Sequence, residues 1–225
     1  MITRELQPNQ VAVIAVDIEA CFMPATEGER LGLAGYGELP CEDGEQVVQP
    51  MNELLAAGRG VGAYLAATRD WHKPETAHIA QDGNAPNFDT TWPAHGIEDT
   101  PGAEYHAELL IDDVVDYKKG NEVVIDPVDD DSYTGANGYD ADGNMLLDTL
   151  VERGVRVAVL GGLALNYCVK ATAESLLAEG IEVVIARDAT KTVFTNQYDD
   201  AVAELQNNGV KFQTTDEILA GVLAA

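Results

Sequence analysis

Short apolar runs rich in β-branched residues alternate with longer segments of helical periodicity along most of the chain. Residues 11–18, VAVIAVDI, form an almost unbroken apolar run of the length of a buried strand. Residues 43–58 follow with apolar positions at helical spacing and end on a glycine. This order recurs further along the chain, and it predicts successive strand–helix units.

Five further strands and four further helices continue the pattern. Strands are expected at 61–68, 113–117, 155–161, 181–186 and 210–214, and helices at 143–154, 166–180, 198–208 and 216–223. Strands that alternate with helices of this length form parallel sheets, because each crossover helix packs back onto the sheet. We therefore expect an α/β fold: a doubly wound, mainly parallel six-stranded sheet with helices on both faces.

The length of 225 residues fits a single domain, residues 1–225, better than two. Within it, a long polar loop covers about 70–106, and an acidic, glycine-rich excursion covers about 126–144. The excursion contains DPVDDD and DADGN, but neither piece has EF-hand spacing with a closing glutamate. We interpret it as a solvated excursion and not as a calcium loop.

The net charge of the chain restricts the classes of molecule that it is expected to bind. Thirty-nine acids face thirteen bases, for a formal net charge of -26. Such a field repels nucleic acid and anionic membranes, so neither is expected as a partner. Only six residues are lysine, and an acidic, lysine-poor surface suits high salt, where counter-ions screen self-repulsion. A salt-adapted source is one hypothesis, and an ordinary acidic protein is the alternative.

The chain also lacks the sequence marks of membrane insertion or export. No run approaches the roughly 18 apolar residues that span a bilayer, and the first ten residues have no apolar signal-peptide core. The three cysteines, at 21, 41 and 168, form no CxxC pair and no disulfide framework. We expect a cytoplasmic protein.

Three of the four histidines lie in residues 68–95, where His72, His78 and His95 follow Asp70. A carboxylate and several imidazoles in a polar loop are typical ligands of a borderline divalent metal. Surface histidines that bind nothing are the alternative, because the spacing matches no common structural zinc motif.

Further reactive side chains follow the predicted strands. Asp17 ends the first strand and interrupts its apolar run, Asp70 ends the second, and Lys119 follows the third. In open α/β sheets, ligands bind beyond the carboxyl ends of the strands, so these groups are expected at one edge. For Asp17, capping of the next turn is the alternative.

Cys168 follows the fourth strand and is expected in the first turn of the next helix. A helix N-terminus stabilises a thiolate, and its free N–H groups can receive an oxyanion. A small buried core cysteine is the alternative. Together with Asp17 as base and Lys119 as cation, the thiol suggests acyl transfer from an amide through a thioester, beside a metal that holds substrate or water.

Ordered motifs over nearly the whole chain resemble those of the nicotinamidase branch of the isochorismatase-like hydrolases. They are VDIEACF at 16–22, GELPCEDGEQVVQPMNEL at 37–54, TRDWH at 68–72, WPAHGIEDTPGAEYH at 92–106, KG at 119–120, DSYTG at 131–135 and ALNYCVKATA at 164–173. The DxH motif followed by WPxH distinguishes nicotinamidases from family members without a metal.

The resemblance implies a catalytic triad of Asp17, Lys119 and Cys168 on a doubly wound sheet. Lys119 is preferred to its neighbour Lys118 because it precedes a glycine. The resemblance also implies a cis peptide between Leu163 and Ala164, and an oxyanion hole formed by the N–H groups of Ala164 and Cys168.

The implied metal ligands are Asp70, His72 and His95. His78 has the spacing of a sub-branch in which this histidine also ligates the metal, whereas elsewhere it contacts the metal through water. One divalent ion is expected, zinc first, with iron or manganese as alternatives.

Four aromatic residues match or adjoin the family's pyridine pocket: Phe22, Trp92, Tyr133 and Tyr167. Ordinary core packing is the alternative for Phe22 and Trp92. The family's QND tripeptide is Glu19, Ala20 and Cys21 here, so an acid replaces a neutral amide near Asp17 and is expected to raise its pKa.

The function implied is deamidation of nicotinamide to nicotinate and ammonia. The alternatives are a related cysteine amidohydrolase acting on another small amide, and a catalytically silent metal-binding homologue in which Glu19 has spoiled the base. Cofactor-free isochorismate hydrolysis would leave the histidine cluster and Cys168 unexplained. The expected partner is a small amide, and self-association is expected by analogy with the family.

Overall fold

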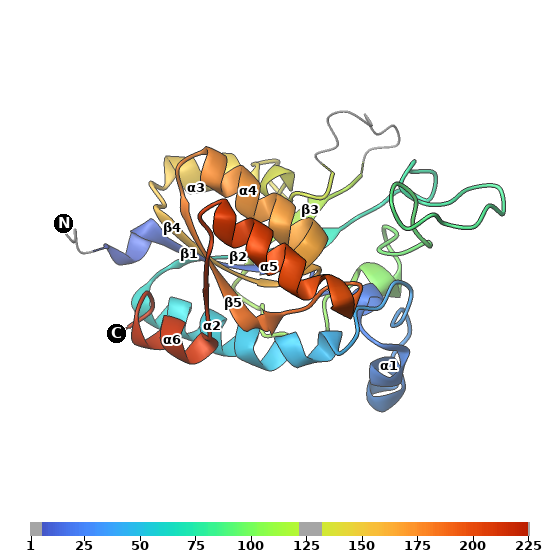
Figure 1. The fold of residues 1–225 in the computed structure, drawn as a ribbon, viewed down its shortest axis with the longest axis horizontal. Coiled ribbons are helices and arrows are strands. Elements are labelled where there is room, and N and C mark those ends of the chain that lie inside the picture. Colours follow the sequence, from blue (N-terminus) through green and yellow to red (C-terminus); the bar gives the residue numbers. More distant parts are fainter. Residues whose placement is uncertain (1–5, 122–131, 225) are drawn as a thin grey trace.

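A six-stranded parallel sheet forms the centre of the computed structural model, which describes residues 6–121 and 132–224 (Figure 1). The strand order is β3-β2-β1-β4-β5-β6, and every neighbouring pair is parallel. The strands are β1 (Val11–Val16), β2 (Tyr64–Asp70), β3 (Val115–Lys119), β4 (Val157–Gly162), β5 (Glu182–Thr190) and β6 (Lys211–Gln213). The doubly wound parallel sheet expected from the sequence is thus confirmed.

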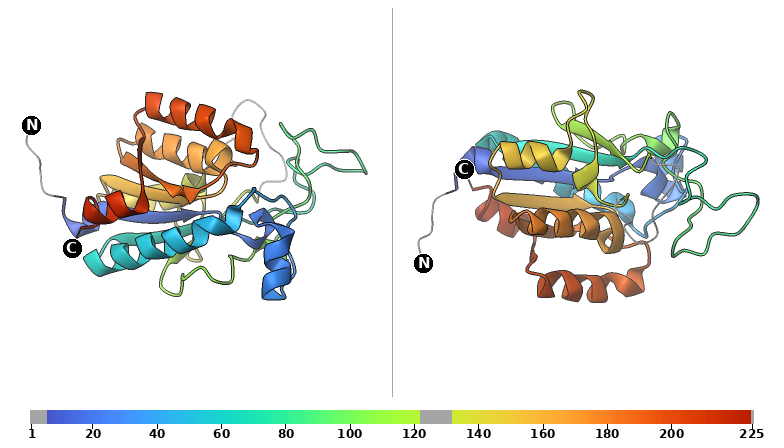
Figure 2. Two further views of the ribbon diagram at one scale, coloured as in Figure 1. Left: turned by 60° about the horizontal axis from the view of Figure 1, so that its bottom comes forward. Right: turned by 90° about the horizontal axis from the view of Figure 1, so that it is seen from above.

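Helices cover both faces of this sheet (Figures 1 and 2). The α-helices are α1 (Ala25–Leu31), α2 (Val48–Val61), α3 (Leu146–Glu152), α4 (Lys170–Ala178), α5 (Tyr198–Asn207) and α6 (Thr215–Ala220). Helices α2 and α6 pack on one face, and α3, α4 and α5 on the other. None of the helices in the described ranges is long and apolar enough to cross a membrane.

The central strand shows why an unbroken apolar run predicted a buried strand. Successive side chains of a strand point to opposite faces of the sheet. Val11, Val13 and Ala15 therefore pack in the core beneath α2, whereas Ala12, Ile14 and Val16 pack in the core beneath α3 and α4. Because both faces are covered, neither set alternates with polar residues.

Some predicted boundaries were wrong for local reasons. The helix expected at 143–154 begins only at Leu146, because the Asp140 carboxylate accepts the N–H groups of Asp142 and Asn144 in a turn. Helix α1 was not predicted; it has only seven residues, and one of them is a glycine. DPVDDD, at 126–131 of the acidic excursion, lies outside the described residues.

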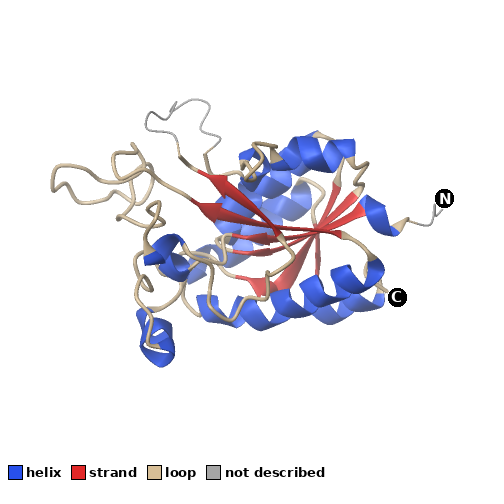
Figure 3. Ribbon diagram, turned by 180° about the vertical axis from the view of Figure 1, so that it is seen from behind, coloured by secondary structure: helices blue, strands red, loops and turns tan. Residues whose placement is uncertain are grey.

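The carboxyl ends of the strands meet at one edge of the sheet, from which the longest loops extend (Figure 3). The register of β2 on β3 pairs Asp70 with Lys119, and the register of β1 pairs Val16 with both Thr68 and Gly162. Four chain segments that carry candidate site residues therefore converge on this edge.

Substitution of Gly162 tests how closely the segment at the end of β4 approaches β1. It has φ 131, and a Cβ built there would lie 1.8 Å from the Val16 carbonyl oxygen. We expect Gly162→Ala to lower the free energy of unfolding, measured by urea denaturation, by at least about 2 kcal/mol. The control Gly60→Ala, in α2 with nothing within 4 Å of the new Cβ, should raise it by about 0.5 kcal/mol. Equal unfolding midpoints for the two variants would contradict this account.

Candidate active site

The Lys119 ammonium lies at the centre of the buried groups at this edge. Its Nζ is 2.9 Å from Asp17 Oδ2 and 2.5 Å from Asp70 Oδ1. It also donates to Cys168 Sγ at 3.5 Å. All four residues are at most 5% exposed. The structure therefore brings together the three residues expected as a triad and adds Asp70 to them.

These neighbours shift one another's acidity. Burial lowers the pKa of Lys119, but Asp17 and Asp70 outweigh it and hold the pKa well above its usual range. Burial alone would raise the pKa of Asp70, but Lys119 and His72 outweigh it and hold the pKa well below its usual range. Burial raises the pKa of Asp17 and, more strongly, that of the Cys168 thiol. A neutral thiol thus lies beside a carboxylate of raised basicity and a charged ammonium.

Asp17 is held in place by β2. It adopts φ 48, a left-handed conformation that aspartate tolerates better than most residues. Its N–H donates to the Thr68 carbonyl, and the Thr68 hydroxyl donates to its Oδ1 at 2.6 Å. The carboxylate therefore faces the site and pairs with Lys119, in place of the turn-capping alternative. Thr68 was missed in the sequence, although it begins the TRDWH motif.

Cys168 lies in a π-helical turn, Leu165–Val169, and not in the first turn of an α-helix as predicted. The Ala164 carbonyl accepts the N–H groups of Tyr167 and Val169, and the Leu165 N–H donates to the Lys191 carbonyl, so the turn folds around Ala164 before α4 begins. The Leu163-Ala164 peptide bond is cis, as the family resemblance implied.

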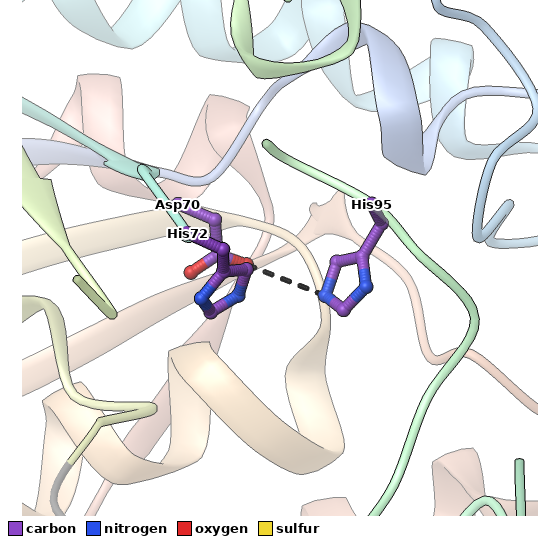
Figure 4. A group of neighbouring side chains, drawn as sticks. All are labelled: Asp70, His72 and His95. Carbon is purple, nitrogen blue, oxygen red and sulfur yellow. Dashed lines mark ion pairs between the residues drawn. The ribbon is translucent and has the colours of Figure 1, made fainter. Parts of the chain in front are cut away.

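Asp70, His72 and His95 form a group whose ligand atoms all lie within 4.8 Å of one another. Figure 4 shows the two rings and the carboxylate gathered around one region. His72 Nδ1 donates to the Gly120 carbonyl at 2.6 Å, and His95 Nδ1 donates to the Pro93 carbonyl at 2.7 Å. Carbonyl oxygens only accept, so each neutral ring carries its proton on Nδ1 and has its lone pair on Nε2, and both Nε2 atoms lie on the Asp70 side. One carboxylate oxygen and two neutral imidazole nitrogens fit a divalent metal such as zinc, iron or manganese.

The two imidazoles have different acidities. Burial and the neighbouring His72 lower the pKa of His95 to about 4, so its ring is neutral near pH 7. Burial would also lower the pKa of His72, but the Asp70 carboxylate outweighs it and raises this pKa.

The other two histidines lie outside this group. His78 Nε2 hydrogen-bonds with the Ser132 hydroxyl, and its ring centroid is 6.3 Å from that of His72. Direct ligation by His78 therefore stays a prediction. His106 accepts the Glu108 N–H at Nδ1 and donates to Glu27 from Nε2 at 3.0 Å. These bonds tie α1 to the loop that precedes β3.

A largely apolar pocket opens beside Cys168 and the group of Asp70, His72 and His95, here called the metal group. The Trp92 indole N–H donates to the Tyr133 hydroxyl at 2.9 Å, and the Trp92 and Tyr167 ring centroids are 4.9 Å apart. All four aromatic residues predicted for the pocket line it, together with Ala164, Ser132, Leu39 and Val193. Leu39 lies in the quoted motif GELPCEDG, which was a usable signal, whereas nothing in the sequence marked Val193.

Glu19, the acid that replaces a neutral amide of the family motif, contacts the backbone of Asp70. Its Oε2 accepts the Asp70 N–H at 2.8 Å, and its own pKa is raised well above the usual range by burial and then by the Asp70 and Asp17 carboxylates. The pKa of Asp17 is raised, as expected, and burial and Asp70 are the main causes.

Comparisons with known proteins found relatives that match most of this chain. A nicotinamidase/pyrazinamidase of Mycobacterium tuberculosis is 27% identical over 89% of this chain and 96% of that protein. A nicotinamidase of Acinetobacter baylyi is 27% identical over 96% of this chain and 98% of that protein. The crystal structure of the pyrazinamidase of Pyrococcus horikoshii in complex with zinc is 31% identical, with a TM-score of 0.72, over 91% of this chain and 99% of that one.

The family model of the Isochorismatase domain matches residues 11–217. This range includes all six strands and the buried site residues Asp17, Asp70, His72, His95, Lys119 and Cys168. The family expected from the ordered motifs is therefore confirmed, and the chain belongs to the isochorismatase-domain family.

Proposed function

We propose that this chain is a metal-dependent amidohydrolase that converts nicotinamide to nicotinate and ammonia through a cysteine thioester. The observation that carries the proposal is the buried contact of Cys168 Sγ, Lys119 and Asp17 beside three convergent metal ligands. The relatives described as nicotinamidases support the choice of substrate.

The aromatic pocket would hold the pyridine ring. Phe22, Trp92 and Tyr167 line it together with Cys168, so a flat ring packed among them presents its carboxamide to the sulfur. Asp70, His72 and His95 would hold one divalent ion, zinc first, with His78 as a further candidate ligand. When bound, the ion supplies a Lewis acid for the ring nitrogen and so fixes the orientation of the ring.

In acylation, Asp17 takes the thiol proton as the Cys168 sulfur bonds to the carboxamide carbon. Lys119 stabilises the negative charge that develops on the sulfur. The Ala164 N–H donates to no other group among the described residues, and with the Cys168 N–H it would receive the oxyanion. Such a donor contributes about 3 kcal/mol in other hydrolases. Asp17 then gives its proton to the nitrogen, the C–N bond breaks, and ammonia departs. The acyl group remains bound to Cys168 as a thioester.

In deacylation, Asp17 removes a proton from water as the oxygen bonds to the thioester carbon. The C–S bond then breaks, the proton returns from Asp17 to the sulfur, and nicotinic acid leaves and loses its own proton to water to give nicotinate. Lys119 holds the ionised Asp17 in place at the start of each half-reaction, because their ion pair is buried. We place this reaction in the cytoplasm, since all three cysteines are free and buried. Self-association stays a prediction.

Metal removal tests the substrate and the ion together. We expect ammonia release from nicotinamide to fall to background after chelation and to return when zinc is added, with metal content measured on the same sample. A non-aromatic amide such as maleamate should be a poor substrate, because it has no ring nitrogen. Turnover unaffected by complete metal removal would contradict the proposal. No turnover by the metal-loaded protein would favour the silent homologue.

Cys168→Ala tests the nucleophile. We expect no detectable ammonia release, because no thioester can form, while nicotinate binding, measured by titration calorimetry, persists. Cys41→Ala is the matched control, since Cys41 is also a free buried cysteine but does not line the pocket. Turnover that survived in Cys168→Ala would refute this assignment.

Asp17→Asn tests the base. Asparagine keeps the shape of the side chain and can still accept from Thr68, but it cannot take the thiol proton. We expect kcat to fall about 10²- to 10⁴-fold with the fold intact by circular dichroism. Asp116→Asn, on β3 but paired with Arg69, should keep parent activity. A kcat for Asp17→Asn near that of the parent would exclude this role.

A further inference from the structure

Glu19 is a fully buried acid that the proposed mechanism does not use. Its residue exposure is 0%, and its Oε2 accepts the Asp70 N–H at 2.8 Å. Its other oxygen, Oε1, has no hydrogen-bond partner among the described residues. A buried carboxyl group that satisfies a single backbone N–H is costly to place, so its position calls for an explanation.

The backbone that carries Glu19 is itself anchored. Glu19 forms an antiparallel bridge with Tyr105, and the next N–H, that of Ala20, donates to the Glu104 carbonyl at 2.8 Å. Because these bonds fix the Glu19 backbone, its side chain extends from a defined position toward the metal group.

The side chain lies between the two segments that carry the metal ligands. On one side it holds the Asp70 N–H. On the other it faces Gly96, the residue after His95, where an added Cβ would lie 3.6 Å from Glu19 Oε1 and 2.8 Å from the Asp70 Cβ. The His72 N–H donates to the Gly96 carbonyl at 2.9 Å and joins the same two segments. Glu19 thus packs where the segments meet.

Glu19 is not part of the ligand group, whose atoms come from Asp70, His72 and His95. Its contact is with the Asp70 backbone and not with the Asp70 carboxylate. Without this acceptor the Asp70 N–H would be buried and unsatisfied, and the chain would have to move to regain a partner. Such a movement would displace the carboxylate from the two imidazoles.

We propose that Glu19 is a positioning residue for the metal site: it holds the Asp70 backbone against the Gly96 segment, so that Asp70 and His95 reach the same ion. The inference rests on the proposed metal site. It assigns the effect to shape and hydrogen bonding, so a side-chain amide of the same size should substitute for the acid.

The test compares Glu19→Ala and Glu19→Gln in the full-length protein. Zinc affinity is measured by competition with a chromogenic chelator, and ligand geometry by the visible absorption bands of the cobalt(II)-loaded protein. We expect Glu19→Ala to bind zinc about 10- to 100-fold more weakly, with altered cobalt bands. Glu19→Gln should keep parent affinity and parent bands. Because it conserves the packing, it also tests the proposal if Glu19→Ala is unstable.

Glu27→Ala is the matched control, because Glu27 is a largely buried acid that pairs with Arg30 and His106 away from the pocket. It should lower thermal stability without changing zinc affinity. Parent-like zinc affinity in Glu19→Ala would overturn the proposal. Zinc affinity weakened equally in Glu19→Gln and Glu19→Ala would also overturn it, because the charge of Glu19 would then matter and not its position. A parent protein that binds no zinc would instead overturn the metal site itself.

Discussion

The Lys119 ammonium between two buried carboxylates is the interaction on which the rest of the site depends. Asp17 and Asp70 are both excluded from solvent, and without a cation the burial of two ionised acids side by side would be strongly unfavourable. Removing one partner of such a buried pair costs about 3–5 kcal/mol in proteins. Lys119 thereby allows one small region to contain both an acid suited to proton transfer and an acid suited to metal binding.

The parallel sheet supplies this arrangement through its register. Asp70 and Lys119 are paired residues at the ends of β2 and β3, and β1 places Asp17 beside Thr68 of β2. Asp17, Asp70 and Lys119 therefore lie at strand ends or directly after them, whereas the loops contribute the imidazoles and much of the apolar pocket. This division is typical of α/β proteins, in which ligands bind at the carboxyl edge.

The sequence predicted the sheet because β1, β4 and most of β5 are buried on both faces, which leaves continuous apolar runs. It also predicted which residues meet at the edge, because each of them follows a strand or lies in a quoted motif. It could not predict the π-helical turn at Cys168 or the contact of Val193 with the pocket, since both depend on packing between distant segments. The partner of Glu19 was missed for a related reason: it is a backbone N–H, which carries no sequence signal.

The walls of the apolar pocket come from separate loops, with Leu39 before α2, Trp92 in the histidine loop and Val193 after β5. None of these three side chains forms a hydrogen bond or ion pair with Lys119, Asp17 or Cys168 among the described residues. A substitution at Leu39 or Val193 therefore alters the cavity wall without removing a hydrogen bond or ion pair of the latter three residues. The cavity wall and the buried charges thus come from different parts of the fold, so the contour of the cavity can vary without altering the strand ends that carry the charges.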